Sequence, residues 1–469
     1  MLVLPSGANA YVSDWVPFNH ETDLKTIVSQ RVDTALKLAL IREAKNTLDI
    51  ASYDERCDVA FTRPVLTALR DAANRGVKVR FLVSWLGQKL YDNCGRQSTR
   101  EYLLEVPTTV PIDYIIFGGD FKGGGWSWFD AIHEKIVIAD NRMVLTGGRG
   151  WGAYYLGLLD TGFAIRGPLV PLYVERFNAI WQAVQEQVSP VRMTRQHYKP
   201  VRHDNFPWSL QGEEQATYEN VLAWLTTTYP STLQNRLIEP GAPRARLLHH
   251  DFVAQMNSLG KKRGNYIDIS ARLNYLSDPI IDEAIEKLAT VKAARIFMLN
   301  GVTHPRLLTA MLGARARGAE VNVFFNKLEP TEKPLTPMNP TWILSIRDIY
   351  SMLLGKIDVW AFAPTGWLQQ GIYMPKDQIS FEYLHRKLSI FDDTVIFGSH
   401  NMNSPSTFGN DELSVEIEDP ILAADFAEHL YDDALLTNGQ VQDVLQVGRQ
   451  YKWLKKLRGV IPHAILRSM

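Results

Sequence analysis

Two histidine–lysine pairs in the sequence have the residue types and the spacing to act on a phosphate ester. His133 and Lys135 lie two residues apart, and His385 and Lys387 repeat the pair 252 residues later (385 minus 133). A histidine can attack phosphorus or carry a proton near neutral pH. A lysine brings a positive charge to an anionic phosphate. Two copies of the pair predict one composite site built by two related halves of the chain.

Both pairs belong to the longer pattern His-x-Lys-x4-Asp, which ends at Asp140 in the first copy and at Asp392 in the second. Apolar runs over 136–139 and 388–391 follow the lysines and predict buried strands. Alternate side chains of a strand share a face, so the histidine and lysine of one pair point the same way. The aspartate lies an odd step beyond the lysine and points elsewhere. We keep both aspartates in the candidate site as motif members and expect a mainly structural role.

These motifs resemble those of the two-motif members of the phospholipase D superfamily, bacterial cardiolipin synthases above all. The second copy leads into Gly398-Ser399-His400-Asn401, which fits the Gly-Ser-x-Asn pattern of that family. Ser406, Glu412 within Asn410-Asp411-Glu412, and Asp160 also fall where the family has its trailing residues. The first copy leads into Gly147-Gly148-Arg149-Gly150, with Gly150 where the family often has asparagine.

The resemblance implies a mechanism in which one histidine forms a covalent phosphohistidine and the other moves the proton. It implies His133 as the nucleophile and His385 as the acid and base, and the reversed assignment is the alternative. Asp160 and Glu412 would orient the two rings. The lysines and Asn401 would neutralise the phosphate, so this chemistry needs no metal and no other cofactor. The expected substrate-binding residues are Gly147, Gly148, Ser399 and Ser406, together with Trp126 and Trp128.

The alternation of elements predicts α/β layers with a mixed sheet. The first half should contain a strand over 46–53, a helix over 64–75 and a strand over 77–83. The second half should repeat this order, with strands over 266–270, 295–299 and 320–325 and helices over 279–289 and 305–318. The repeat and the resemblance together predict two similar α/β-sandwich halves, related by a pseudo-twofold axis, with the active site at their interface.

The chain divides by composition into three parts. We expect the first half in 1–205, a linker region with a possible helix in 206–245, and the second half in 246–469. The second half ends in a basic, aromatic tail over 449–458. That tail is typical of a membrane-surface helix, although a terminal helix docked on its own domain would show the same pattern.

Composition and charge narrow the class of protein. The 469 residues are 46% hydrophobic and 22% charged, as in ordinary globular proteins. The net charge of −1 gives no general attraction to nucleic acid, so we expect no nucleic-acid partner. The two cysteines, Cys57 and Cys94, cannot form a disulfide framework. Nothing in the sequence indicates an oligomeric state.

The sequence indicates a protein that meets its substrate from the aqueous side of a membrane. Its first residues lack the features of a signal peptide, and no apolar run is long enough for a transmembrane helix. We expect a cytoplasmic protein or a peripheral one at the inner membrane, and secretion without a signal peptide stays open. The glycine- and tryptophan-rich loop over 118–129 favours a phospholipid substrate. A nuclease of the same superfamily and a non-enzymatic scaffold are the alternatives.

Overall fold

The computed structural model describes the greater part of the chain. The described residues are 11–53, 62–84, 109–117, 131–151, 155, 158–185, 191–192, 209–230, 233, 236–258, 277–298, 303–326, 340–362, 383–432 and 439–441.

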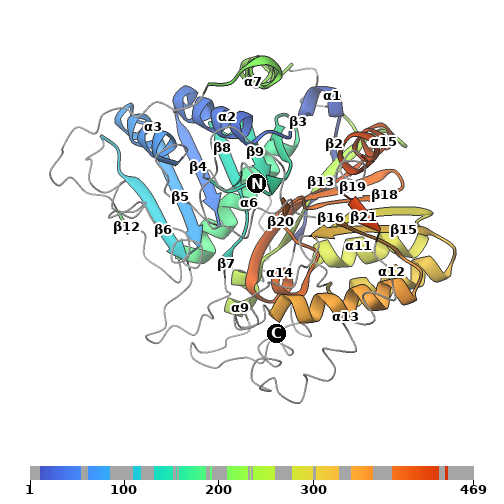
Figure 1. Ribbon diagram of the computed structural model, residues 1–469. Coiled ribbons are helices and arrows are strands. Elements are labelled where there is room, and N and C mark those ends of the chain that lie inside the picture. The colour runs from blue at the N-terminus through green and yellow to red at the C-terminus, as the bar shows by residue number, and fades with distance from the viewer. Residues whose placement is uncertain are drawn as a thin grey trace.

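Two mixed sheets with the same strand order form the framework of the molecule (Figure 1). In the described residues, the first sheet runs β12 (Val191–Arg192), β6 (Ile112–Phe117), β5 (Lys78–Ser84), β4 (Thr47–Ser52), β8 (Ile136–Ala139), β9 (Met143–Gly147), β11 (Gly162–Ile165) and β3 (Leu24–Ile27). The second runs β21 (Gly439–Val441), β16 (Asp358–Phe362), β15 (Glu320–Asn326), β14 (Ala293–Phe297), β18 (Leu388–Phe391), β19 (Thr394–Gly398), β20 (Asn410–Glu418) and β13 (Arg244–His250).

The match between the sheets extends to strand direction. The strands β4, β5 and β6 run parallel, as do β14, β15 and β16. The strand that follows each His-x-Lys pair, β8 or β18, is antiparallel to its neighbours. This repeated order confirms the predicted α/β architecture of two similar halves related by a pseudo-twofold axis.

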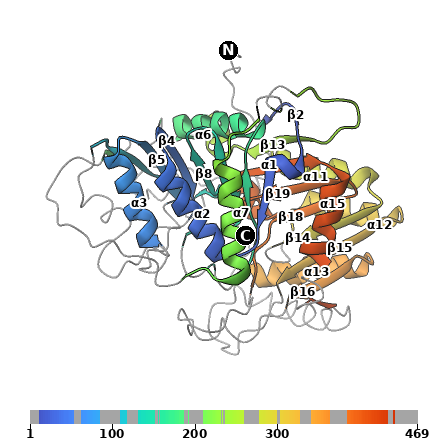
Figure 2. The same ribbon diagram turned by 90° about the horizontal axis from the view of Figure 1, so that it is seen from above.

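Helices cover the outer face of each sheet and separate it from solvent. On the first sheet, α2 (Gln30–Glu43), α3 (Thr62–Asn74) and α7 (Gly212–Thr226) share one apolar core with the strands. On the second sheet, α11 (Pro279–Thr290), α12 (Pro305–Ala316) and α13 (Pro340–Leu354) do the same. Figure 2 shows both outer helix layers from above, with α7 beside α2.

A third core joins the two halves and includes α6 (Leu169–Gln185) and α15 (Pro420–Phe426). At its centre the ring of Phe163 from β11 stacks on Phe397 from β19, with 3.7 Å between the centroids. Both rings are almost fully buried, and burying one such side chain stabilises the fold by about 1.5–3 kcal/mol. The short helices α1 (His20–Asp23), α9 (Phe252–Ser258), α14 (Ser404–Gly409) and the π-helix η2 (Ala427–Asp432) complete the described helices.

The predicted elements agree with the observed ones wherever the structure describes them. The first three correspond to β4, α3 and β5, and four of the second half to α11, β14, α12 and β15. The Asp278 side chain caps α11 by accepting hydrogen bonds from Ile280 and Ile281, which is why this helix begins at Pro279. The strand expected over 266–270 lies outside the described residues.

The chain crosses between the halves near its N-terminus. The strands β1 (Tyr11–Val12) and β2 (Val16–Pro17) pair with β13 of the second sheet, before the chain enters the first half at β3. The segment 206–245 contains α7, whose Val221 and Leu225 are buried in the first half's core. The boundaries at 205 and 245 stay predictions.

Candidate active site

Next to each motif histidine, a short strand of one half pairs with a strand of the other half. The strand β7 (Ala131–Ile132) precedes His133 and pairs in parallel with the start of β20, while β17 (Tyr383–Leu384) precedes His385 and pairs in parallel with β10 (Leu158–Leu159). The amide of His133 donates to the Asp411 carbonyl at 2.9 Å, and the amide of His385 donates to the Leu159 carbonyl at 2.9 Å. Each motif histidine is therefore held against a strand of the other half.

Each histidine ring meets a carboxylate from the opposite half. His133 Nδ1 lies 3.0 Å from Glu412 Oε2, and His385 Nδ1 lies 2.6 Å from Asp160 Oδ2. All four side chains are buried or nearly so. A carboxylate accepts the Nδ1 proton and so leaves Nε2 of the ring without one. Each ring is then fixed in a tautomer in which Nε2 can attack an electrophile or take up a proton.

The motif lysines make the same backbone contact in the two halves. Lys135 Nζ donates to the His133 carbonyl at 2.8 Å, and Lys387 Nζ donates to the His385 carbonyl at 2.8 Å. Lys387 Nζ also lies 3.2 Å from His385 Nε2. Each ammonium group is thus kept beside the histidine of its own motif, where it can neutralise an anion bound to Nε2.

Burial and charge set the protonation states of the site. Burial lowers the pKa of His385 to about 4, and the Lys387 charge adds to this effect. Burial also lowers the pKa of His133, against the opposing charge of Glu412. Burial alone would raise the pKa of Asp160, but the charge and hydrogen bond of His385 outweigh it and bring that pKa to about 2. His133 has the same effect on Glu412, whose pKa falls below its ordinary value. At neutral pH the free site therefore holds neutral rings and ionised carboxylates.

The glycine turns allow the strands to approach these carboxylates closely. Gly147 has a φ of 139°, and a Cβ there would lie 2.5 Å from the Thr161 carbonyl oxygen. A Cβ at Gly148 would lie 2.4 Å from Asp160 Oδ1, so the first turn has no room for a side chain at this position. In the second turn the equivalent residue is Ser399, whose hydroxyl donates to Glu412. Ser399 thus contacts the carboxylate that binds His133.

The remaining polar residues of the second turn support one another. The amide of Asn401 donates to the Ser406 hydroxyl at 3.2 Å, and the amide of Ser406 donates to the Asn403 side chain at 3.1 Å. The buried Oδ1 of Asn401 has no hydrogen-bond partner among the described residues. Asn410, which was expected only as part of the motif context, donates from Nδ2 to Glu412 Oε1 at 3.2 Å.

The motif aspartates lie at the other end of their strands, away from the histidines. Asp140 accepts backbone N–H groups of Lys45, Asn46 and Thr47, and Asp392 accepts those of Lys292 and Ala293. Both have a positive φ, 51° and 49°, as expected for aspartate in a tight turn. In position they are turn residues that join neighbouring strands and have no contact with the rings.

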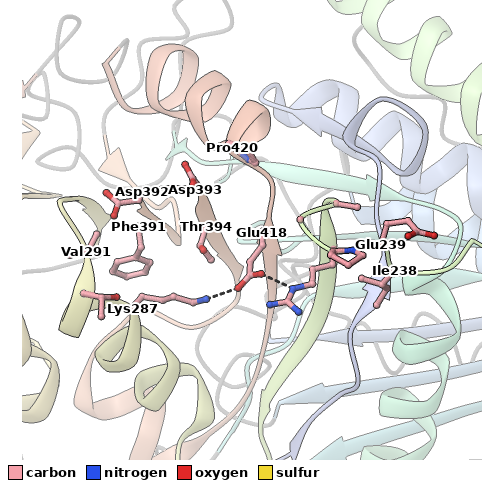
Figure 3. Close-up of a pocket in the computed structure, with 15 residues that line it drawn as sticks. Ile238, Glu239, Lys287, Val291, Phe391, Asp392, Asp393, Thr394, Glu418 and Pro420 are labelled. Carbon is pink, nitrogen blue, oxygen red and sulfur yellow. Dashed lines mark hydrogen bonds and ion pairs between the residues drawn. The ribbon is translucent and has the colours of Figure 1, made fainter.

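Figure 3 shows the surroundings of Asp392, which lines a cavity of about 630 Å³. Lys287 and Glu418 form an ion pair across this cavity, with 2.9 Å between Nζ and Oε1. Its lining residues include neither of the two motif histidines and neither of the two motif lysines. The cavity therefore belongs to the far end of β18 and lies apart from the histidine–carboxylate pairs.

Two tyrosines beside the rings were not identified from the sequence as site residues. The Tyr53 ring meets His133 edge-on at 5.0 Å between centroids, and Lys135 Nζ lies 5.5 Å from the same ring. The Tyr155 ring lies 6.0 Å from that of His385. Tyr155 follows the first motif closely in the sequence, and Tyr53 follows β4, which pairs with β8 in the structure. Trp126 and Trp128 lie outside the described residues.

Comparison with known proteins agrees with this geometry. The model of a family described as cardiolipin synthase, PLD-like domain, matches residues 38–181 and 285–433. The chain belongs to this family. The two matched segments contain both His-x-Lys pairs and both carboxylates that contact the rings.

Two relatives and one solved structure align with most of the length of this chain. An uncharacterized protein of Helicobacter pylori strain J99 is 22% identical over 426 residues, which cover 85% of this chain and 76% of the relative. A second uncharacterized protein, from strain 26695, is 22% identical over 432 residues. The crystal structure of phosphatidylserine synthase from Haemophilus influenzae Rd KW20 matches with a TM-score of 0.65 at 14% identity, covering 97% of this chain and 96% of that one. That similarity establishes the fold.

Proposed function

We propose that the protein cleaves or transfers the phosphodiester of a glycerophospholipid through a covalent phosphohistidine intermediate. The observation that carries the proposal is the pair of buried rings, each with Nδ1 bound to a carboxylate of the other half. Two rings whose Nδ1 atoms are bound to carboxylates, each beside a lysine, are suited to one phosphodiester, because that reaction needs both a nucleophile and a proton carrier.

In the proposed first step, His133 Nε2 attacks phosphorus and the bond from phosphorus to the leaving oxygen breaks. A proton from His385 Nε2 passes to that oxygen, so that an alcohol leaves. In the second step, water or an acceptor alcohol attacks phosphorus and gives its proton to His385. The bond from phosphorus to His133 then breaks, which restores the free enzyme. Glu412 and Asp160 would stabilise the imidazolium that forms beside each of them.

Substrate binding would raise the pKa of the acid, which then takes its proton from solvent. Because its pKa is about 4, His385 is neutral in the free site near pH 7. A bound phosphodiester anion would offset the charges of Lys135 and Lys387, both of which lower the pKa of this ring. Protonation of His385 is then favoured in the complex, where the proton is used. The same two lysines would neutralise the non-bridging oxygens in the transition state.

The proposed partner is phospholipid at a membrane surface. None of the described helices is long and apolar enough to cross a membrane. We propose peripheral contact through the loop over 118–129 and the tail over 449–458, both of which lie outside the described residues. Tryptophans suit the headgroup level of a bilayer, and basic residues attract anionic lipid.

Product analysis on phosphatidylglycerol vesicles tests the function. We expect phosphatidic acid if water is the acceptor and cardiolipin if a second phosphatidylglycerol is. Added glycerol should suppress net cardiolipin formation, because it returns the phosphatidyl group to phosphatidylglycerol. EDTA should leave the rate unchanged, and His133→Asn should abolish both turnover and covalent labelling. Cleavage of oligonucleotides without any lipid product would replace this proposal with the nuclease alternative.

The nucleophile is assigned by a separate measurement. A covalent intermediate quenched with denaturant at mildly alkaline pH, where the N–P bond of a phosphohistidine survives, and mapped by mass spectrometry should carry its phosphatidyl group on His133. A label found on His385 instead would reverse the two roles without changing the reaction class.

A further inference from the structure

A buried arginine joins the two strand ends that bring His133 and Glu412 together. Arg176 of α6 is 2% exposed. Its Nε donates to Glu134 Oε1 at 2.8 Å, its Nη1 to Asp251 Oδ2 at 3.1 Å and its Nη2 to Asp411 Oδ1 at 3.1 Å. One guanidinium from the first half thus contacts two carboxylates of the second half and one of its own.

The sequence positions of these partners connect the cluster to the site. Glu134 follows His133 directly, and Asp411 directly precedes Glu412. Arg176 therefore binds both the residue that follows His133 and the residue that precedes Glu412. Between them, His133 Nδ1 meets Glu412 at 3.0 Å. A displacement of either strand end would change the geometry of this contact.

The second histidine is supported in a different way. At the position equivalent to Glu134 the second motif has Arg386, and at the position equivalent to Asp411 the first half has Leu159. Arg386 Nε donates to the Thr161 hydroxyl at 2.9 Å, next to Asp160, and its Nη1 donates to the Leu430 carbonyl. The two sites have the same core geometry, but an arginine within the motif supports His385, whereas an arginine from α6 supports His133.

The charge of the cluster also distinguishes the two sites. Three buried carboxylates share one guanidinium, and Glu134 Oε2 has no hydrogen-bond partner among the described residues. Burial raises the pKa of Glu134, and burial with the neighbouring Asp251 charge raises that of Asp411. Removing Arg176 would leave these carboxylates without a buried cation, so the strand ends would lose their common partner.

We propose that Arg176 is a positioning residue for His133, which it keeps in contact with Glu412 by binding Glu134 and Asp411 at once. The consequence for catalysis rests on the proposed function, but the consequence for the ring does not. Lysine at this position would keep the charge but could not bind three carboxylates in the planar arrangement of a guanidinium. If His133 lost its contact with Glu412, its ring would populate both tautomers, while the His385 ring would keep one.

The test compares Arg176→Lys with Arg80→Lys in the full-length protein. Arg80 forms a two-point ion pair with Asp49 at 2.6 and 2.7 Å and also contacts α6 at Asn178, but none of these partners adjoins His133 or Glu412. The Arg80 side chain is 27% exposed and binds a single carboxylate, so Arg80→Lys controls for the loss of an arginine ion pair beside α6 without touching the carboxylates next to His133 and Glu412. Nitrogen-15 NMR of labelled histidine reports the tautomer of each ring without any substrate, with His133 assigned through His133→Gln.

We expect His133 to become a tautomer mixture in Arg176→Lys and to keep one tautomer in Arg80→Lys. With phosphatidylglycerol, kcat of Arg176→Lys should fall about 10²-fold, as for a small misplacement of a reacting group, while KM changes little. Asp411→Leu should have the same effect on the ring, because it removes the link to β20 and one buried charge together. This second variant decides the question if Arg176→Lys does not fold.

The NMR and turnover results separate the two proposals. An unchanged His133 ring in both variants, or an equal change at His385, would overturn the positioning role. A wild-type protein without lipid turnover would contradict the proposed function, but the ring would still decide the role of Arg176.

Discussion

When the protein unfolds at mildly acidic pH, His385 should take up nearly one proton. The His385 side chain is 13% exposed and binds Asp160, and burial lowers its pKa from 6.5 to about 4. Between these two values the unfolded chain carries the proton and the folded protein does not. Stability must therefore rise with pH across this window, and the contribution is fully expressed above pH 6.5.

The size of the effect follows from the two pKa values. The difference of about 2.5 units corresponds to about 3.4 kcal/mol between the ends of the window, at 1.36 kcal/mol per unit. At pH 5.25, midway between them, the ring would be about 95% protonated when unfolded and about 5% protonated when folded. Its contribution to proton uptake on unfolding is then about 0.9 proton.

The assay is a potentiometric measurement of proton uptake when the unbuffered protein is transferred into denaturant at pH 5.25. The perturbation is the double variant His385→Gln with Asp160→Asn, which removes the ring together with the carboxylate that it would otherwise leave buried and unpaired. We expect the variant to take up about 0.9 proton less than the wild type. At pH 8 the two proteins should not differ, which gives an internal control. Equal uptake by both proteins at pH 5.25 would refute the assignment of a buried neutral ring.

Three further predictions concern the site and its surroundings. Asp160→Asn should lower kcat about 10³–10⁴-fold in steady-state assays with little change in KM, since the amide no longer fixes the ring tautomer, whereas a loss below tenfold would argue against this role. Asp392→Ala should lower the free energy of unfolding by about 1–3 kcal/mol, because two backbone N–H groups lose their acceptor; activity per folded molecule should be retained, and a loss of activity at unchanged stability would assign this residue to the chemistry. Trp126→Ala combined with Trp128→Ala should weaken salt-sensitive sedimentation with anionic vesicles while turnover of a short-chain soluble substrate survives, and unchanged sedimentation would exclude this loop from membrane contact.

Much of the fold could be predicted from the sequence because the repeated elements have strong local signals. The helix α11 combines an aspartate cap, an N-terminal proline and an apolar stripe. The neighbouring strand β14 is a short, mostly apolar run. The odd spacing of Asp140 and Asp392 was enough to predict that they point away from the histidines. These features depend on neighbours a few residues apart, which a single sequence displays directly.

The contacts across the interface could not be predicted in the same way. The bond between His133 and Glu412 joins residues 279 apart in sequence, and that between His385 and Asp160 joins residues 225 apart. The family resemblance indicated that these carboxylates orient the rings, but the pattern gave no rule for which carboxylate meets which ring. The support from Arg176 was also hidden, because an arginine in the middle of α6 has the sequence context of an ordinary helix residue.

The exchange of carboxylates explains why the site requires both halves to be assembled. Neither half contains a complete pair, since each ring contacts a carboxylate from the other side of the interface. The stacked rings of Phe163 and Phe397 lie in the core between the same two sheets, so the halves that supply the rings and the carboxylates are also joined by a shared apolar contact. Duplicated elements account for the similarity of the two histidine sites. Their neighbours differ, with Arg176 and three carboxylates next to the His133 site and Arg386 next to the His385 site, so the two chemically identical residues have different electrostatic surroundings within a symmetric framework.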